Sequence, residues 1–279
     1  MARTGFNGRN VYLFGGSAGI GLETARLLAG RGAHILLFAR NRERLDKAVE
    51  DVSRHRMTRN QVFTGLALDV ADREAVRAAV GQAVAGFGVP QVVINAAGRA
   101  IPRRFEEISY EQFDETMKIN LYGTWNTVSA VVPHMKERGG TIVNTSSVGG
   151  FVGVFGYADY AASKFAVIGL SEVLRSELKR YRIDVQVLCP PDTDTPGFEV
   201  ENRTKPAETR AVSGGGGLLE AVDAARALLR GIERRDPVIV PGFEGRLTWW
   251  MKRHVPDVVE LVMDRSIRKA QRTQQEAGR

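Results

Sequence analysis

Short apolar runs alternate with longer amphipathic segments along most of the chain. The apolar, β-rich runs predict seven strands, at residues 10–14, 34–39, 61–69, 91–95, 141–145, 184–189 and 237–240. Between them, segments such as residues 22–29 and 72–87 carry apolar residues every three or four positions, which is the period of a helix. Strands joined by helical crossovers form a parallel sheet with helices on both faces. The pattern therefore predicts a Rossmann-type, doubly wound α/β fold that binds ligands at the carboxyl ends of its strands.

Two segments interrupt this alternation. Residues 190–217 contain four prolines and end in a glycine run, and residues 242–279 follow the last predicted strand. A long loop inside a compact fold usually acts as a lid or a binding loop, and glycines at 214–217 would give it a hinge. We expect one domain over 1–279, with a core at about 8–241, a substrate loop at 190–217 and a C-terminal helical extension.

Composition excludes several classes of function. The net charge is +7, but the arginines lie on predicted helices that also carry Asp and Glu, so we expect no nucleic-acid partner. The single cysteine, Cys189, allows no internal disulfide, and the four histidines have no ligand spacing, so no metal is expected. No segment has the length and apolarity of a membrane span or a secretory signal, and we expect a cytoplasmic protein.

A glycine-rich turn connects the first predicted strand to the first predicted helix. Glycines here permit a tight turn and let backbone N–H groups approach a pyrophosphate at the helix N-terminus. The alternative is an ordinary glycine turn. The nucleotide-binding interpretation assigns cofactor contacts to Gly15, Ser17, Gly19, Ile20 and Gly21.

The ends of the next strands extend this predicted site. Arg40 ends the second strand, where an acidic residue would favour NADH, whereas an arginine suits the 2′-phosphate of NADPH. Arg40 could equally be a solvated surface charge. The third and fourth strands end at positions expected to lie beside the adenine and the middle of the cofactor, namely Asp69, Val70, Asn95, Ala96 and Gly98.

Tyr160 and Lys164 are four residues apart and share one face of a predicted helix. A free tyrosine has a pKa of about 10, and a nearby ammonium would bring its proton within reach of catalysis near neutral pH. The spacing alone could be a surface pair. Tyr157 lacks a lysine four residues later and is not assigned a catalytic role.

Together these motifs resemble the short-chain dehydrogenase/reductase family from about residue 11 to residue 240. The family combines a glycine-rich turn, an Asn-Ala-Gly segment and a Tyr-x-x-x-Lys helix. The resemblance implies carbonyl reduction with NADPH, in which Ser147 binds the carbonyl oxygen and Tyr160 donates the proton. It also implies that Asn120 supports a water near Lys164.

The same resemblance implies further contacts and an assembly. Pro190 and Thr195 would contact the nicotinamide end of the cofactor, and Tyr160 and Lys164 would also contact its ribose. A homodimer or homotetramer would form through the helices that contain Asn120 and Tyr160. A noncatalytic NADPH-binding regulator is the alternative, but such a protein has no need for all four catalytic groups.

The segment from Pro190 to Arg210 resembles the 3-ketodihydrosphingosine reductase branch of this family. That resemblance implies a lipid substrate, a long-chain 3-keto base that is reduced to its 3-hydroxy form. Apolar residues expected to line a substrate channel, unless they belong to the core, are Phe151, Val154, Phe155 and Phe198. Reduction of another apolar carbonyl, such as a retinoid, steroid or 3-ketoacyl group, remains open.

The tail contains a segment suited to a membrane surface. Trp249 and Trp250 precede Lys252, Arg253 and His254, and a predicted apolar helix follows, up to about residue 263. Tryptophans favour the bilayer interface and basic groups attract anionic lipid, so residues 247–263 could hold the protein at a membrane. Packing of this tail on its own domain or on a partner subunit is the alternative.

Overall fold

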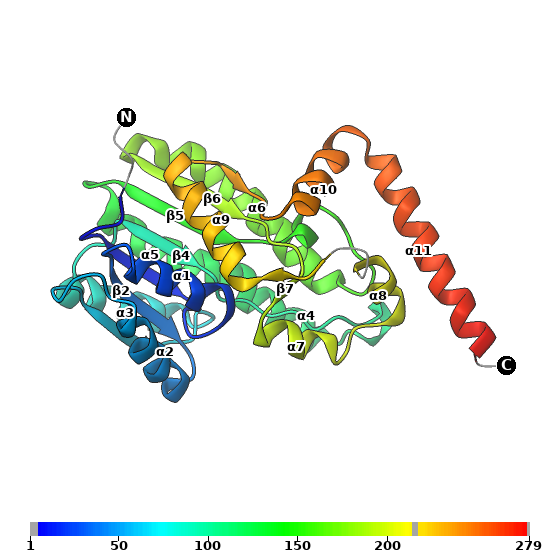
Figure 1. The fold of residues 1–279 in the computed structure, drawn as a ribbon, viewed down its shortest axis with the longest axis horizontal. Coiled ribbons are helices and arrows are strands. Elements are labelled where there is room, and N and C mark those ends of the chain that lie inside the picture. The colour runs from blue at the N-terminus through cyan, green and yellow to red at the C-terminus, as the bar shows by residue number, and fades with distance from the viewer. Residues whose placement is uncertain (1–4, 214–216, 278–279) are drawn as a thin grey trace.

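Seven parallel strands form the central sheet, in the order β3-β2-β1-β4-β5-β6-β9 (Figure 1). The computed structural model describes residues 5–213 and 217–277. The strands are β1 Asn10–Phe14, β2 His34–Ala39, β3 Phe63–Ala67, β4 Val92–Asn95, β5 Gly140–Thr145, β6 Ile183–Leu188 and β9 Val238–Ile239. The predicted doubly wound α/β fold is confirmed.

Three strands are shorter than predicted, and β4 lacks only the first predicted residue. Only Val238 and Ile239 form β9. The third strand begins at Phe63 because Gln61 anchors the preceding loop. The Gln61 amide donates to the carbonyls of Ala29 and Ala33 at 2.8 and 2.9 Å and accepts from two loop N–H groups.

Helices cover both faces of the sheet. They are α1 Gly19–Ala29, α2 Arg42–Arg54, α3 Arg73–Phe87, α4 Tyr110–Met117, α5 Gly123–Met135, α6 Ala158–Leu178 and α9 Ala221–Arg234. Alternate strand residues point to opposite faces. Val11 and Leu13 therefore contact the layer of α1, α2 and α9, whereas Tyr12 and Phe14 contact the layer of α3, α5 and α6.

The segment predicted as one long loop contains short elements instead. These are β7 Thr193–Asp194, α7 Pro196–Asn202 and α8 Ala207–Ser213, and β7 pairs with β8 Leu219–Glu220. The Thr195 hydroxyl accepts from the Phe198 N–H at 3.1 Å, which caps the start of α7. The segment is therefore not one continuous loop, and of the predicted hinge glycines 214–217, residues 214–216 lie outside the described residues.

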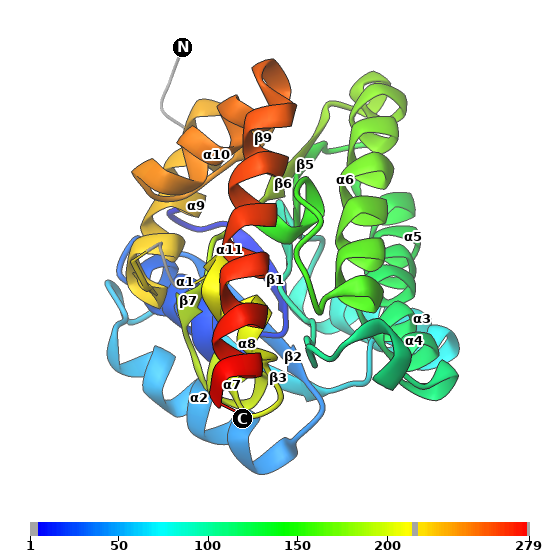
Figure 2. The ribbon, with the colours of Figure 1, turned by 90° about the vertical axis from the view of Figure 1, so that its right-hand side faces the viewer.

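Two helices form the tail, α10 Phe243–His254 and α11 Pro256–Ala277. Trp249 of α10 meets the ring of Phe151 edge-on, with centroids 4.7 Å apart, and Val259 of α11 is buried. Figure 2 shows α11 crossing the side of the molecule formed by α7 and α8, and α11 contacts α8. Among the described helices, none combines the length and apolarity that crossing a bilayer requires.

Candidate active site

Two adjoining cavities lie at the carboxyl edge of the sheet. The larger has a volume of about 820 Å³ and the smaller about 340 Å³. Ala18, Ile20, Gly98, Thr145 and Thr195 line both, so the cavities share a boundary. The smaller cavity follows the glycine-rich turn, and the larger reaches from β5 and α6 to the tail.

The glycine-rich turn brings two segments of backbone into close approach. Gly15 has a φ of +87°, and a Cβ there would lie 2.5 Å from the Ala97 nitrogen. A Cβ on Gly21 would lie 2.3 Å from the Gly15 carbonyl oxygen. The turn therefore requires glycine at both positions, for its conformation and for its packing.

The start of α1 lines the smaller cavity. The helix begins at Gly19, and its N-cap residue, Ala18, provides no side-chain hydrogen bond. Ser17, Gly19, Ile20 and Gly21 all line the cavity. An uncapped helix N-terminus presents N–H groups and positive potential to an anion, so this end of the cavity fits a pyrophosphate.

Two arginines stand at the other end of the smaller cavity, with Asp69 and Val70. Arg40 and Arg44 both line the cavity and are exposed, and neither forms an ion pair with any described residue. Arg42, by contrast, pairs with Asp46 at 2.9 Å. Sequence reasoning did not assign Arg44 to the site, although its position in the first turn of α2 places it beside the end of β2.

These features fit a dinucleotide that carries a 2′-phosphate: a cradle that only glycine allows, an uncapped helix N-terminus and two unpaired guanidinium groups. Ala96 and Gly98 line the cavity wall between them. The side chain of Asn95, which was assigned to the cofactor, lies elsewhere. It is buried in the sheet, where its amide donates to Asn144 Oδ1 at 2.8 Å.

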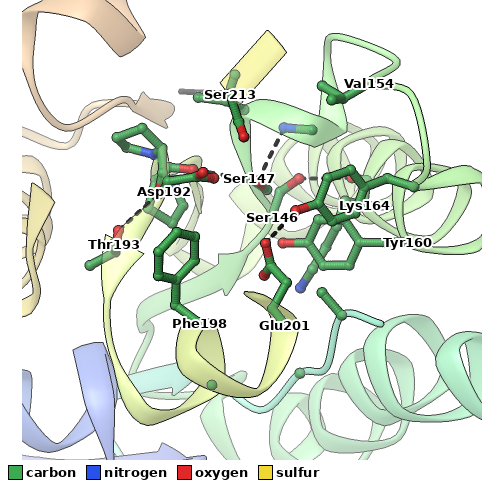
Figure 3. A pocket seen from close by; sticks show the side chains of 18 of the residues that line it. Ser146, Ser147, Val154, Tyr160, Lys164, Asp192, Thr193, Phe198, Glu201 and Ser213 are labelled. Atoms are coloured by element: carbon green, nitrogen blue, oxygen red, sulfur yellow. Dashed lines mark hydrogen bonds between the residues drawn. The ribbon is translucent and has the colours of Figure 1, made fainter. Parts of the chain in front are cut away.

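Tyr160, Lys164 and Ser147 line the larger cavity together (Figure 3). Tyr160 and Lys164 come from α6, and the Lys164 ammonium lies 5.7 Å from the centre of the Tyr160 ring. Ser147 follows β5 and caps the next turn, where its hydroxyl accepts from the Gly149 N–H at 3.1 Å. The three residues thus lie close together in the fold, as their spacing in the sequence predicted.

Burial sets the protonation of this group. It raises the pKa of Tyr160 above the ordinary value for a phenol, and a hydrogen bond with Ser147 partly offsets that increase. Burial also lowers the pKa of Lys164 to about 8, while its ammonium donates to the Thr145 carbonyl at 2.9 Å. Tyr160 is therefore protonated at neutral pH, which is the form that can donate a proton to a carbonyl oxygen.

Asn120 lies beside Lys164 but does not line either cavity. It is fully buried in a π-helical turn, η2 Lys118–Tyr122, between α4 and α5. Its amide donates to the Arg99 carbonyl at 3.0 Å and to Ser163 Oγ at 2.9 Å. A Cβ built on Gly98 would lie 3.3 Å from both Asn120 Oδ1 and Lys164 Nζ, so the two side chains approach each other at this glycine.

The predicted substrate residues separate into two pairs. Val154 and Phe198 line the larger cavity. Phe151 does not, because its ring packs against Trp249, and neither does Phe155, whose carbonyl accepts from Thr209 Oγ1 at 2.8 Å. Pro190 and Thr195 line the larger cavity as well, next to the cofactor end.

Sequence analysis did not assign several other residues to the cavity wall. Tail residues that line the larger cavity are Thr248, Met251, Val259, Val262 and Met263. Tyr157 also lines it, with its ring 5.5 Å from that of Tyr160. The Tyr157 hydroxyl donates to Glu201. The two residues are 44 positions apart in the sequence, so no local sequence pattern predicts this contact.

Comparison with known proteins identifies the family. The family described as short chain dehydrogenase matches residues 9–206. The chain belongs to the short-chain dehydrogenase family. Within this family, the 3-dehydrosphinganine reductase of Danio rerio is 39% identical over 226 residues, which cover 80% of this chain and 68% of that protein.

Further relatives carry related names. The 3-ketodihydrosphingosine reductase of Dictyostelium discoideum is 39% identical over 84% of this chain and 75% of its own length. That of Mus musculus is 41% identical over 74% of this chain and 63% of its own length. Among solved structures, levodione reductase superposes with a TM-score of 0.74 at 26% identity, over 86% of this chain and 99% of that one. L-Sorbose reductase from Gluconobacter frateurii, solved with NADPH and L-sorbose, gives the same TM-score at 22% identity, over 86% and 97% of the two chains, and so supports the fold.

Replacing the buried lysine tests the electrostatics of the site. At neutral pH the folded protein bears the cost of a buried ammonium, so Lys164→Met is expected to raise the free energy of unfolding by on the order of 1–3 kcal/mol. Because the pKa of Lys164 is lowered to about 8, the folded wild type loses this proton while the unfolded chain still holds it. Wild-type stability therefore rises with pH above about 8, and the advantage of Lys164→Met shrinks there.

Urea unfolding from pH 6.5 to 9.5 measures this difference. The exposed Lys269 provides a control, since Lys269→Met is expected to show no such pH-dependent gap. A gap that stays constant with pH for Lys164→Met would show that the ammonium is not destabilised by burial.

Proposed function

We propose that this chain is an NADPH-dependent reductase that converts a long-chain 3-keto base, such as 3-ketodihydrosphingosine, to its 3-hydroxy form. The observation that carries the proposal is the position of Ser147, Tyr160 and Lys164 at one end of an 820 Å³ cavity whose wall is largely apolar. The names of the relatives that match most of the chain support the same substrate.

Each catalytic side chain has a distinct task in this reaction. The bound dinucleotide supplies the hydride. Ser147 donates a hydrogen bond to the carbonyl oxygen, and Tyr160 gives its proton to the oxygen as negative charge develops there. Lys164 stabilises the resulting phenolate by its positive charge, and Asn120, close to Lys164 at Gly98, supports the water that returns the proton.

The cofactor is held by groups along the smaller cavity. The glycine-rich turn and the first turn of α1 bind the pyrophosphate, and Arg40 with Arg44 bind the 2′-phosphate. Pro190 and Thr195 contact the nicotinamide end, where both cavities meet.

The remote end of the larger cavity suits an aliphatic chain. It is formed by apolar side chains of α7 and the tail, among them Phe198, Met251, Val259 and Met263. Because the tail completes this wall, we propose that residues 1–279 form one domain. Retinoid or steroid carbonyls are the alternative apolar substrates and belong in the same assay.

An exposed apolar surface on α5 and α6 supports the proposal of a homodimer or homotetramer. Trp125 of α5 and Phe165 and Val173 of α6 are exposed, and so is Tyr122, which directly precedes α5. Patches of this kind commonly mark subunit contacts. Sedimentation velocity measures the assembly directly.

A second exposed apolar surface supports the proposal of peripheral membrane contact. Trp250, Val258 and Leu261 are about half exposed on α10 and α11, and Val262 is both exposed and part of the cavity wall. The surface thus adjoins the cavity from which a lipid would be taken. Trp249 faces inward instead, because it packs against Phe151.

The proposed activity predicts NADPH oxidation by the purified protein with 3-ketodihydrosphingosine, at a higher kcat/KM than with retinal or a ketosteroid. Tyr160→Phe is expected to lower kcat by about 10² to 10⁴, because it removes the proton donor, and to leave the Kd for NADPH within a few-fold. Tyr110→Phe, a change at an exposed tyrosine on α4, serves as the control. Turnover by Tyr160→Phe at the wild-type rate would exclude the mechanism.

Cofactor preference tests the two arginines. Arg40→Asp is expected to lower the ratio of kcat/KM for NADPH to that for NADH by about tenfold or more, because a phosphate partner becomes a ribose acceptor. Arg42→Asp is a matched control, since Arg42 pairs with Asp46 and does not line the cavity. An unchanged ratio in Arg40→Asp would remove Arg40 from phosphate recognition.

Membrane contact is tested by flotation with anionic phosphatidylserine vesicles at low salt. Wild type is expected to float with the vesicles, and Trp250→Ala/Leu261→Ser to float less, because exposed aromatic and aliphatic groups enter the interface. The control is Lys269→Met, which removes one exposed charge from α11 outside this surface. Equal flotation of wild type and the double variant, or none by wild type, would disprove this contact.

A further inference from the structure

A carboxylate stands in the wall of the substrate cavity, on the side of α7. Glu201 lines the larger cavity together with Tyr160 and Ser147, and its side chain points toward them in Figure 3. Its side chain is 15% exposed, which leaves it open to the cavity but largely shielded from bulk water. The charge on Glu201 also contributes to the raised pKa of Tyr160, as expected for a carboxylate near the phenol.

Two partners fix the orientation of this carboxylate. Both the Tyr157 hydroxyl and the Lys205 ammonium bind its Oε1 atom, the latter at 3.1 Å. Lys205 also contacts Asp192 at 3.3 Å and is almost fully buried. No described residue donates a hydrogen bond to Oε2, so this oxygen can still accept one.

The charges around Glu201 do not balance. Asp192 and Glu201 together carry two negative charges, and Lys205 supplies one positive charge to the pair. Among the other charged residues of the cavity wall, Arg99 pairs with Glu115, Glu244 accepts from the Gly217 N–H, and Lys164 donates to Thr145. Arg40 and Arg44 line this cavity too and have no ion-pair partner among the described residues, but they are assigned to the cofactor phosphate. A shielded carboxylate with a free oxygen is costly unless a cation joins it.

We propose that Glu201 binds an ammonium group of the substrate, so that the cavity selects ketones bearing a cationic amine beside the reacting carbonyl. This inference rests on the proposed function. A long-chain 3-keto base carries its amino group on the carbon next to the ketone, so a carbonyl at Ser147 and Tyr160 brings the amine to the same end of the cavity. A charge-assisted hydrogen bond to Oε2 would then fix which face and end of the ketone reach the site.

The position of Glu201 makes it a specificity residue. A neutral ketone gains nothing from the carboxylate and must leave it unpaired, whereas an amino ketone satisfies it. The apolar part of the cavity wall offers similar contacts to any aliphatic chain. The carboxylate therefore separates substrates that the apolar wall cannot distinguish.

Glu201→Gln removes the charge and keeps the shape and an oxygen for the Tyr157 hydroxyl. With this variant, kcat/KM for 3-ketodihydrosphingosine is expected to fall by about tenfold or more, chiefly through KM. For a neutral ketone of the same chain length without the amino group, kcat/KM is expected to stay unchanged or to rise. Glu199→Gln is the matched control, since Glu199 is an exposed glutamate on the same helix.

Inhibition provides a second measurement that does not require turnover of the amino ketone. With the neutral ketone as substrate, a long-chain primary amine is expected to inhibit wild type more strongly than the alcohol of equal length, and Glu201→Gln is expected to remove that difference. The Kd for NADPH and the melting temperature of the variant show whether the fold is retained.

Three results would overturn the proposal. Equal losses with both ketones would assign Glu201 a structural role in holding α7, and unchanged kinetics with both would assign it none. If wild type reduces the amino ketone in either case, the proposed function stands and this inference alone fails. If wild type reduces only the neutral ketone and the amine does not inhibit preferentially, both fail together.

Discussion

The ammonium of Lys164 is held out of water at the end of β5, and the centre of the site is arranged around it. Its immediate partner is the Thr145 carbonyl, and the Lys164 carbonyl in turn accepts from Ser146 Oγ at 2.8 Å. Gly98 leaves room beside it for Asn120, and a Cβ on Gly150 would lie 2.9 Å from the Lys164 carbonyl oxygen. The fold bears the cost of a desolvated charge here, and it keeps that charge close to the phenol that needs it.

This arrangement assigns different tasks to two neighbouring serines. Ser146 is buried and fastens the backbone of α6 to the end of β5, whereas Ser147 faces the cavity. Both serines lie just beyond β5, and Ser147 caps the turn that follows. The hydroxyl assigned to the proposed reaction and the anchor of α6 thus come from adjacent positions.

The parts of the site that local patterns encode could be predicted from the sequence. The glycine-rich turn, the strand ends and the pair of Tyr160 and Lys164 depend on spacings of a few residues within one element or across one turn. Arg44 lies in the first turn of α2, four residues after Arg40, so the same local pattern contains it.

The substrate end could not be predicted in the same way. Tyr157 was set aside because no lysine follows it at helical spacing, but its partner is Glu201, on an element that reaches it only through the fold. Phe151 was assigned to the cavity from its position in the sequence, yet the tail provides Trp249 to cover it. Tertiary packing decides which apolar side chains are covered by others and which remain facing a cavity.

The two halves of the site therefore come from opposite ends of the chain, and this has a consequence during synthesis. The glycine-rich turn, β4 and β5 leave the ribosome early, so a cofactor-binding half can assemble while translation continues. The apolar wall waits for Met251, Val259 and Met263, which are among the last residues made. The apolar wall of the larger cavity is therefore completed only after the residues of the glycine-rich turn and of the end of β5 have been made.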